Sequence, residues 1–425
     1  MPAGEAVSRL SMRIRLKFGR GEVEGELPAG WRVTELVPPQ RPALENPAAA
    51  LEKFLDAPVG GPPFDDMAKR WNNVCVIVPD ITRKAGAHLL LPALLARLER
   101  LGRGPEGVII VFASGTHPPQ TEAQKRSIVG GEVFSRYRCI EHNARGSCVP
   151  RGGVALNPHV AAADGIIIVG SVKAHYLAGF GGGRKALLPG VASYDECIRL
   201  HRLSLNPDAP GRHPRIGPGI LAGNPMHETS LAAAKAAGAG FCINTVLDPS
   251  GAIIFLNAGD VERSHAEACR YVEAYQGAVI GAPADVVIAS CGGFPSDLNF
   301  IQSHKGLDNA CLAARDGGAV LLVSECPAGI GNPAFLDWFG HPDIAAMDRA
   351  LRENFAINGQ TAMATREKTL RCRVALLSAL PAEQARRMGM TPVGSLEEGI
   401  AFCRATAGET ANAVIFPDAG LVLPR

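Results

Sequence analysis

Short apolar runs alternate with helix-like stretches along much of the chain. The first three runs are 73–78 (NVCVIV), 107–113 (GVIIVFA) and 165–169 (GIIIV). Residues 88–101 and a segment that opens at Thr121 lie between them and favour helices, with Thr121 and Gln124 spaced as a capping box. Continuous apolar runs separated by helices are typical of buried parallel strands. The pattern therefore predicts a parallel α/β unit.

The same rhythm restarts after about residue 275. The further strands expected there are 285–289, 319–324, 373–377 and 413–416, with a helix near 305–316. At the other end of the chain, residues 11–38 alternate apolar and polar residues and predict a small antiparallel hairpin, followed by a helix over 45–57. We expect two α/β domains, 1–275 and 276–425, with mainly parallel sheets and a cofactor and substrate cleft between them.

Composition narrows the function classes. The 425 residues carry a formal net charge of +2 and no long basic run, which argues against binding to nucleic acid or to a membrane surface. The 11 cysteines are scattered singly, as expected of reduced thiols in a cytoplasmic protein. No apolar run reaches the roughly 18 residues that a membrane span needs.

Polar residues follow each of the first three predicted strands. Asp80, Thr82 and Arg83 follow the first strand, His117 follows the second, and His175 follows the third. Ligands of parallel α/β sheets bind beyond the carboxyl ends of the strands. Any one of these residues could be a solvated loop residue, but three successive strand ends with such groups predict a binding site.

A glycine run, GFGGGRK, ends at Lys185 and contains Gly181, Gly182 and Gly183. It fails the dinucleotide fingerprint, since Arg184 stands at the last glycine position, and the Walker pattern, since Ala186 follows the lysine. Consecutive glycines can still bring backbone N–H groups close to an anion. The run therefore predicts an unusual phosphate site or, as the simpler alternative, a tight turn.

Three further side chains are candidates for ligand roles. His201 lies on the predicted helix after the glycine run, and Gln302 and Lys305 follow the first strand of the second domain. The last two could close on a substrate carboxylate from the side opposite Arg83. On spacing alone, His117, His175 and His201 could equally be a three-histidine zinc site.

Five segments together resemble the nickel-dependent lactate racemase family. They are PDITR (79–83), ASGTHPP (113–119), VKAHYLAGFGGGRKALLPG (172–190), the helix with His201, and FPSDLNFIQSHKGLDNA (294–310). The central segment, in which a lysine follows a histidine by ten residues with a glycine run between them, is the most specific.

The resemblance implies a nickel-pincer nucleotide, a pyridinium mononucleotide whose two sulfur-bearing arms and one carbon bind nickel. It implies a thioamide link to Lys185, His201 as the fourth nickel ligand, and the phosphate among Gly181, Gly182 and Gly183. Square-planar nickel accepts such a ligand set with an imidazole. Enzymes that synthesise the cofactor are then implied partners.

The resemblance also implies an activity, the inversion of the C2 centre of a 2-hydroxyacid. Hydride transfer from C2 avoids a carbanion beside a carboxylate, and two bases serve the two enantiomers. His117 and His175 match these bases, and histidine exchanges protons near neutral pH. Arg83, Gln302 and Lys305 match substrate-binding positions, Asp80 is expected to orient the site, and Thr82 to contact the cofactor.

Two departures bear on the substrate. Ile301 stands where lactate racemase has a tyrosine, and no tryptophan occurs in the sequence around Gln360. Both predict a roomier pocket and a 2-hydroxyacid other than lactate, with His304 and Gln360 as candidate polar partners of a polyhydroxy acid. A zinc-dependent hydrolase and a non-catalytic phosphate binder remain the alternative functions.

Overall fold

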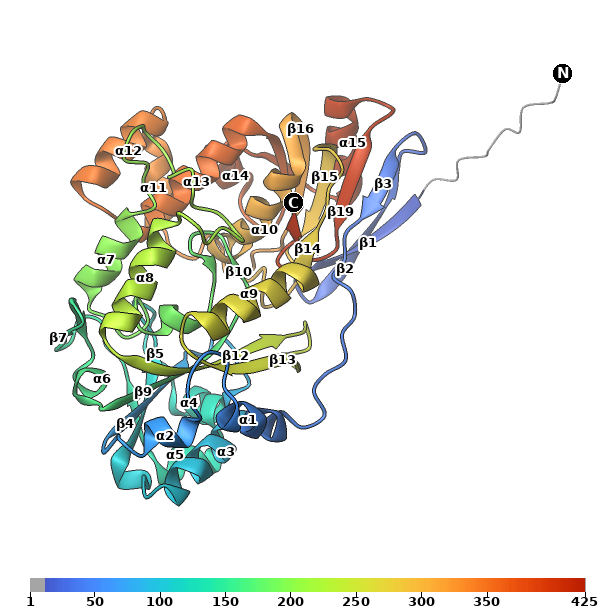
Figure 1. The fold of residues 1–425 in the computed structure, drawn as a ribbon. Helices are drawn as coiled ribbons and strands as arrows, with labels where there is room; N and C mark the ends of the chain where they lie inside the picture. The colour runs from blue at the N-terminus through green and yellow to red at the C-terminus, as the bar shows by residue number, and fades with distance from the viewer. Residues whose placement is uncertain (1–11, 425) are drawn as a thin grey trace. The chain divides into compact units, whose positions relative to one another are not determined.

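The computed structural model describes residues 12–424, which form two compact units (Figure 1). The N-terminal unit consists of Gln40–Ser204 and His213–Tyr275. The C-terminal unit consists of Leu205–Arg212, Gln276–Arg425 and Met1–Pro39, in so far as these are described. The units change over at 275/276, where the sequence suggests a boundary, but the described part of the first 39 residues groups with the C-terminal unit.

A six-stranded sheet forms the centre of the N-terminal unit. In spatial order its strands are β13 (Ile253–Gly259), β12 (Ala239–Leu247), β9 (Gly165–Ser171), β4 (Val74–Pro79), β5 (Val108–Ala113) and β6 (Arg138–Glu141). All neighbouring pairs are parallel except β12 and β13. The expected runs are thus strands of one mainly parallel sheet, whereas β12 and β13 were not foreseen.

Helices cover both faces of this sheet. On one face Val74, Val76 and Val78 pack with α1 (Pro47–Asp56), α2 (Phe64–Ala68) and α3 (Ala87–Arg100). On the other face Cys75 and Ile77 pack with α6 (Pro158–Ala162), α7 (Tyr194–Arg202) and α8 (Pro225–Ala236). Alternate residues of β4 point to opposite faces, and both faces are apolar. The strand is therefore apolar throughout, and every residue before Pro79 is buried.

The remaining elements of this unit are shorter or peripheral. They are η1 (Pro105–Gly107), α4 (Glu122–Val129), α5 (Gly131–Arg136), β7 (Val149–Arg151), β8 (Val154–Leu156), β10 (Ala174–His175), β11 (Gly179–Phe180), η2 (Gly183–Ala186) and α9 (Arg263–Gln276). Thr121 and Gln124 form the predicted reciprocal capping box at the start of α4. At the start of α7 the Ser193 side chain accepts the backbone N–H of Glu196, as in a capping box. The Glu196 carboxylate does not complete the box, because it accepts the backbone N–H of Ala155 instead.

The C-terminal unit has its own six-stranded sheet, and each pair of neighbouring strands in it is parallel. Its order is β18 (Thr391–Val393), β17 (Arg373–Leu377), β16 (Ala314–Val323), β15 (Ala284–Ser290), β19 (Asn412–Phe416) and β3 (Arg32–Glu35). Its helical elements are α10 (Phe300–Ala313), α11 (Ala334–Asp337), η3 (Trp338–Gly340), α12 (Ile344–Glu353), α13 (Ile357–Arg371), α14 (Ala382–Arg387) and α15 (Leu396–Ala407). Two short strands, β14 (Gly277–Ala278) and β20 (Leu423–Pro424), pair beside it.

The expected N-terminal hairpin is present as β1 (Met12–Phe18) and β2 (Gly21–Leu27), while residue 11 lies outside the described residues. Its apolar side packs with α15 against the sheet of the C-terminal unit. β3 adds a parallel edge strand beside β19, so these residues group with the C-terminal unit. The helix expected near 305–316 begins earlier, at Phe300, because the Asn299 side chain caps it.

All 11 cysteines are free thiols, and nine of them are buried. Across residues 12–424, no helix combines the length and the apolar character that crossing a bilayer requires.

Candidate active site

Three polar loops of the N-terminal unit lie at one edge of its sheet. They follow β9, β4 and β5, which are adjacent and parallel, so their carboxyl ends meet at the same edge. The loops are 80–83, 114–117 and 172–175. The sheet topology therefore brings together the segments that the sequence predicts to form a site.

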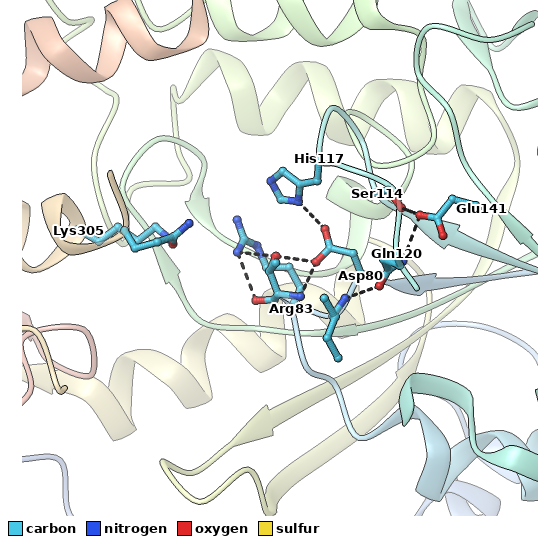
Figure 2. A network of polar contacts seen from close by, with 10 residues as sticks. Asp80, Arg83, Ser114, His117, Gln120, Glu141 and Lys305 are labelled. Atoms are coloured by element: carbon cyan, nitrogen blue, oxygen red, sulfur yellow. Dashed lines mark hydrogen bonds and ion pairs between the residues drawn. The ribbon is translucent and has the colours of Figure 1, made fainter. Parts of the chain in front are cut away.

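Asp80 and His117 face each other from two of these loops (Figure 2). Oδ2 of Asp80 lies 2.5 Å from Nδ1 of His117. An ionised carboxylate can only accept, so Nδ1 carries the proton and the neutral ring keeps a lone pair on Nε2. The Asp80 side chain is 4% exposed, whereas that of His117 is 45% exposed. The buried acid thus holds an accessible imidazole in one tautomer.

The other oxygen of Asp80 organises its own loop. Oδ1 accepts from the backbone N–H of Thr82 at 2.7 Å and from its hydroxyl at 2.6 Å. Burial alone would raise the pKa of Asp80, but the hydrogen bonds and charge of His117, together with Thr82 and Arg83, hold it below its usual value. Arg83 donates through Nη1 to the Thr82 hydroxyl at 3.2 Å and is itself partly exposed.

A second layer of contacts supports this pair, and sequence analysis did not foresee it. Gln120 accepts the backbone N–H of Ile81 at 2.7 Å and donates through Nε2 to Glu141 at 3.2 Å. Glu141 also accepts from the hydroxyl of Ser114 (Figure 2). These residues lie on different segments, at β5, β6 and the loop before α4. No local pattern links positions 81, 120 and 141.

His175 lies on β10, and its Nδ1 accepts the backbone N–H groups of Leu177 and Ala178, each at 3.2 Å. A nitrogen that accepts two donors carries no proton, so the neutral ring bears its proton on Nε2. The ring also stacks on Tyr176, with centroids 5.3 Å apart. His175 and His117 are therefore held in opposite tautomers.

The glycine run packs closely against the strand edge. A Cβ on Gly182, whose φ is +75°, would lie 2.8 Å from the carbonyl oxygen of Ser171. A Cβ on Gly183 would lie 2.7 Å from the His265 ring. The N–H of Gly181 donates to the carbonyl of Lys173 at 2.8 Å, so this glycine serves the loop itself. Close packing therefore requires glycine at positions 182 and 183.

Arg184 fixes the segment just before Lys185. Its side chain is fully buried and donates to the carbonyl of Ala178 at 2.8 Å and to Nε2 of His265 at 2.7 Å. Desolvation lowers the pKa of Arg184 to about 10 and that of His265 well below its usual value. An arginine that replaces a fingerprint glycine is therefore an internal anchor of the loop.

His201 is half-buried on α7. Its Nδ1 lies 2.7 Å from the carbonyl oxygen of Cys197, so this nitrogen carries the proton and Nε2 keeps a lone pair. Desolvation, together with the charges of Lys185 and His117, lowers the pKa of His201 to about 4. The ring is thus neutral at physiological pH, as a metal ligand must be.

In the C-terminal unit, Gln302 and Lys305 lie one turn apart on α10, and the ammonium of Lys305 donates to Oε1 of Gln302 at 2.8 Å. His304 and Gln360, the candidate polar partners of a polyhydroxy acid, are both buried in the C-terminal unit. Although the sequence near Gln360 lacks tryptophan, a Cβ on Gly359 would lie 2.4 Å from the indole of Trp338. An aromatic ring from η3 therefore occupies this neighbourhood.

The histidines do not form a zinc site of the predicted kind. Within residues 12–424, no three or more His, Cys, Asp or Glu side chains are grouped closely enough to hold a metal ion. A catalytic zinc ion needs three protein ligands. The zinc hydrolase alternative is therefore not favoured.

Comparison with known proteins matches both parts of the chain. Residues 18–211 match the lactate racemase N-terminal domain, and residues 279–423 match the lactate racemase C-terminal domain. The lactate racemase of Thermoanaerobacterium thermosaccharolyticum is 28% identical over 389 residues, which cover 88% of this chain and 90% of that protein. The lactate racemase of Lactiplantibacillus plantarum is 32% identical over 294 residues, or 67% of this chain and 68% of that protein.

Solved structures agree with these matches. The lactate racemase apoprotein from Thermoanaerobacterium thermosaccharolyticum superposes with a TM-score of 0.86 at 26% identity, covering 97% of this chain and 100% of that chain. A protein from Thermotoga maritima superposes with a TM-score of 0.61 at 18% identity, covering 92% and 100% of the two chains. The second likeness concerns the fold alone.

Proposed function

Because this chain belongs to the lactate racemase family, we propose that it is a racemase or epimerase that inverts the C2 centre of a 2-hydroxyacid. The observation that carries the proposal is the Asp80–His117 pair at the carboxyl edge of the sheet. A buried carboxylate that fixes the tautomer of an accessible imidazole is the arrangement that a general base requires.

The two histidines would handle the hydroxyl proton. Nε2 of His117 has the lone pair that accepts this proton, and the negative charge of Asp80 stabilises the resulting imidazolium. His175 would donate a proton from Nε2 to the carbonyl oxygen of a 2-oxoacid as an imidazolium, because a neutral ring that gave up this proton would be left as an imidazolate. In that form Nδ1 of His175 also carries a proton and must release the backbone N–H groups of Leu177 and Ala178. For the opposite enantiomer the two histidines exchange roles.

The residues present fit a nickel-pincer nucleotide. His201 presents an unprotonated Nε2, and Lys185 follows a loop that Arg184 anchors. His201 would supply the protein ligand to the metal of this cofactor, because imidazole is a suitable ligand for nickel. When bound, this cofactor supplies a hydride acceptor for the C2 hydrogen. We propose that Lys185 holds it covalently and that Gly181, Gly182, Gly183 and Thr82 contact it.

The substrate carboxylate would bind to Arg83, whose planar guanidinium matches a carboxylate with two parallel hydrogen bonds. We assign Gln302 and Lys305 as further substrate-binding residues, since an amide and an ammonium suit the hydroxyl and carboxylate of the same molecule. Asp80 contributes by fixing both His117 and the Thr82–Arg83 segment. The free thiols favour a reducing compartment such as the cytoplasm, where cofactor-synthesis enzymes would be the partners.

The test uses the full chain produced together with cofactor-synthesis enzymes. Intact mass first establishes that the cofactor is attached. The protein is then incubated with single enantiomers of lactate, 2-hydroxybutyrate, malate and gluconate, and the products are separated by chiral chromatography. We expect one of these acids to be inverted at C2. Cofactor-loaded protein that inverts none of these acids would contradict the proposed function.

A further inference from the structure

Gln120 links the two loops that carry Asp80 and His117. It is 8% exposed, and its Oε1 accepts the backbone N–H of Ile81, the residue between Asp80 and Thr82. Gln120 itself lies three residues after His117. One amide side chain therefore connects the end of the His117 loop to the middle of the Asp80 loop.

Glu141 determines the orientation of the Gln120 amide, that is, which side its oxygen and its nitrogen face. Its Oε1 accepts from Nε2 of Gln120 at 3.2 Å and from the hydroxyl of Ser114, and Lys125 lies 3.1 Å from its Oε2. A carboxylate has no donor, so it can face only the NH₂ group of Gln120. The carbonyl of Gln120 must then face Ile81, which is the orientation that the Ile81 N–H needs.

We propose that Gln120, oriented by Glu141, is a positioning residue that sets the contact between Asp80 and His117. The proposal rests on the proposed function in that His117 is the group whose position matters to the reaction. Gln120 touches neither His117 nor Asp80 by a hydrogen bond of its own. Its effect passes through the Ile81 backbone, where a small shift moves the Asp80 carboxylate directly.

Gln120→Glu removes the hydrogen bond from Gln120 to Glu141 with little change of shape. One oxygen of the new carboxylate can still accept the Ile81 N–H, but the other would face Oε1 of Glu141. Two carboxylates cannot share that contact without a proton, so the loop must shift. Misplacement by about 1 Å costs about a hundredfold in rate at an active site. We therefore expect kcat to fall roughly 10- to 100-fold, with KM changed less than about twofold.

Exchanging the two groups should repair the network. In Gln120→Glu/Glu141→Gln, the new amide at position 141 can accept from Lys125 through its oxygen and donate to both the Ser114 hydroxyl and the new carboxylate. The new carboxylate at position 120 still accepts from Ile81. Every polar group regains a partner, so the double variant should recover kcat to within about threefold of the wild type.

Gln124→Glu is the matched control. It makes the same chemical change four residues away, at the third residue of α4, where Gln124 accepts the backbone N–H of Thr121 at 2.8 Å. A glutamate serves a capping box equally well. This variant should therefore keep the kcat and thermal stability of the wild type.

The readout specific to positioning is the proton on Nδ1 of His117. A proton shared with a buried carboxylate gives a downfield NMR resonance, which His117→Ala assigns by removing it. It is measured on the full chain without cofactor. We expect the resonance in the wild type, the Gln124→Glu control and the double variant, and its loss in Gln120→Glu. Should Gln120→Glu fail to fold, Gln120→Ala breaks the same link without adding charge.

The outcomes separate the two proposals. A folded Gln120 variant that keeps the resonance overturns the positioning role, and so does a folded double variant that fails to regain it. A wild type that inverts none of the acids contradicts the proposed function, while the resonance still decides whether Gln120 positions His117. Loss of the resonance in Gln120→Glu and its return in the double variant support the positioning role.

Discussion

Oδ2 of Asp80 lies 2.5 Å from Nδ1 of His117, while Oδ1 of the same carboxylate binds both donors of Thr82. One buried acid therefore sets the tautomer of the candidate base and the path of the loop that leads to Arg83.

Asp80→Asn should abolish most activity without unfolding the protein. Thr82 donates twice to Oδ1, so the amide oxygen would take that place and the NH₂ group would face His117. A donor there forces the ring proton to Nε2 and removes the lone pair that the base needs. We expect kcat to fall about ten-thousandfold, the order seen when an amide replaces an orienting carboxylate. Chiral chromatography measures the rate, and a kcat within twofold of the wild type would contradict the assignment.

His117→Ala and His175→Ala should each slow the reaction in both directions to the same extent. Two enantiomers have equal free energy, so any change in kcat/KM for one must equal the change for the other. We expect a loss of about 10²- to 10⁴-fold for each variant, as for removal of a general acid or base. Initial rates from each pure enantiomer provide the measurement. A variant that racemises at nearly the wild-type rate removes that histidine from the mechanism.

The sequence predicts the parallel strands well because both of their faces are buried. β4, β5 and β9 are continuous apolar runs, and the residues after them form one edge for topological reasons. β12 and β13 were missed although they are equally regular, since no helix-like stretch separates them. β3 was assigned to the hairpin region, and only long-range pairing with β19 reveals its place.

The residues of the candidate site likewise fall into those that the sequence predicts and those that only the structure reveals. Residues at strand ends, such as Asp80 and His117, follow directly from the strand pattern. Gln120 and Glu141 do not, because their roles depend on hydrogen bonds between segments that no local spacing relates. The tautomers of His175 and His201 likewise depend on which backbone groups their rings meet, which only the folded chain shows.

Lys185→Ala should prevent retention of the cofactor, because it removes the proposed covalent link. Lys235→Ala is a suitable control, since Lys235 is half-exposed on α8 and pairs only with Glu262 among the described salt bridges. Both variants are produced with the cofactor-synthesis enzymes and compared by intact mass and nickel content. Stoichiometric cofactor on the Lys185→Ala chain would show that the attachment is elsewhere.

Asp308→Asn should destabilise the C-terminal unit in a pH-dependent way. Asp308 is buried and accepts from Lys368 at 2.6 Å and from Arg212 at 3.2 Å. Burial alone would raise the pKa of Asp308, but these two cations and His304 hold it well below its usual value. Removing one partner of a buried pair costs about 3–5 kcal/mol. Urea unfolding at pH 7 should show a loss of that order.

The sign of the pH effect follows from the lowered pKa of Asp308. The stabilisation is complete above the unfolded-state pKa of about 3.9 and disappears as the pH falls towards the lower folded-state pKa. The difference between wild type and Asp308→Asn should therefore stay constant from about pH 7 to pH 5 and shrink below about pH 4. Glu409→Gln, at an exposed pair with Arg404, should change stability by less than about 1 kcal/mol throughout. A difference that grows in acid would contradict this assignment.

The identity of residue 301 should influence which acid is preferred. Ile301 is half-buried on α10, next to Gln302, at the position where the sequence resemblance predicts a tyrosine. The sequence suggested a further loss of aromatic volume near Gln360, but Trp338 packs there against Gly359. The argument for a roomier pocket therefore depends on Ile301 alone. We accordingly expect the preference between two acids to change only by the amount that one side-chain contact contributes.

Ile301→Tyr should shift preference towards lactate over 2-hydroxybutyrate. The larger ring fills space that an extra methylene would occupy, and one methylene in an apolar pocket is worth about 10- to 200-fold in specificity. We expect the ratio of the two kcat/KM values to change about tenfold. Leu312→Tyr, at an exposed position near the other end of α10, serves as the control and should leave the ratio unchanged. An unchanged ratio in Ile301→Tyr would show that this side chain does not line the substrate, and the assignment of the two histidines would stand, because it depends on hydrogen bonds in the other unit.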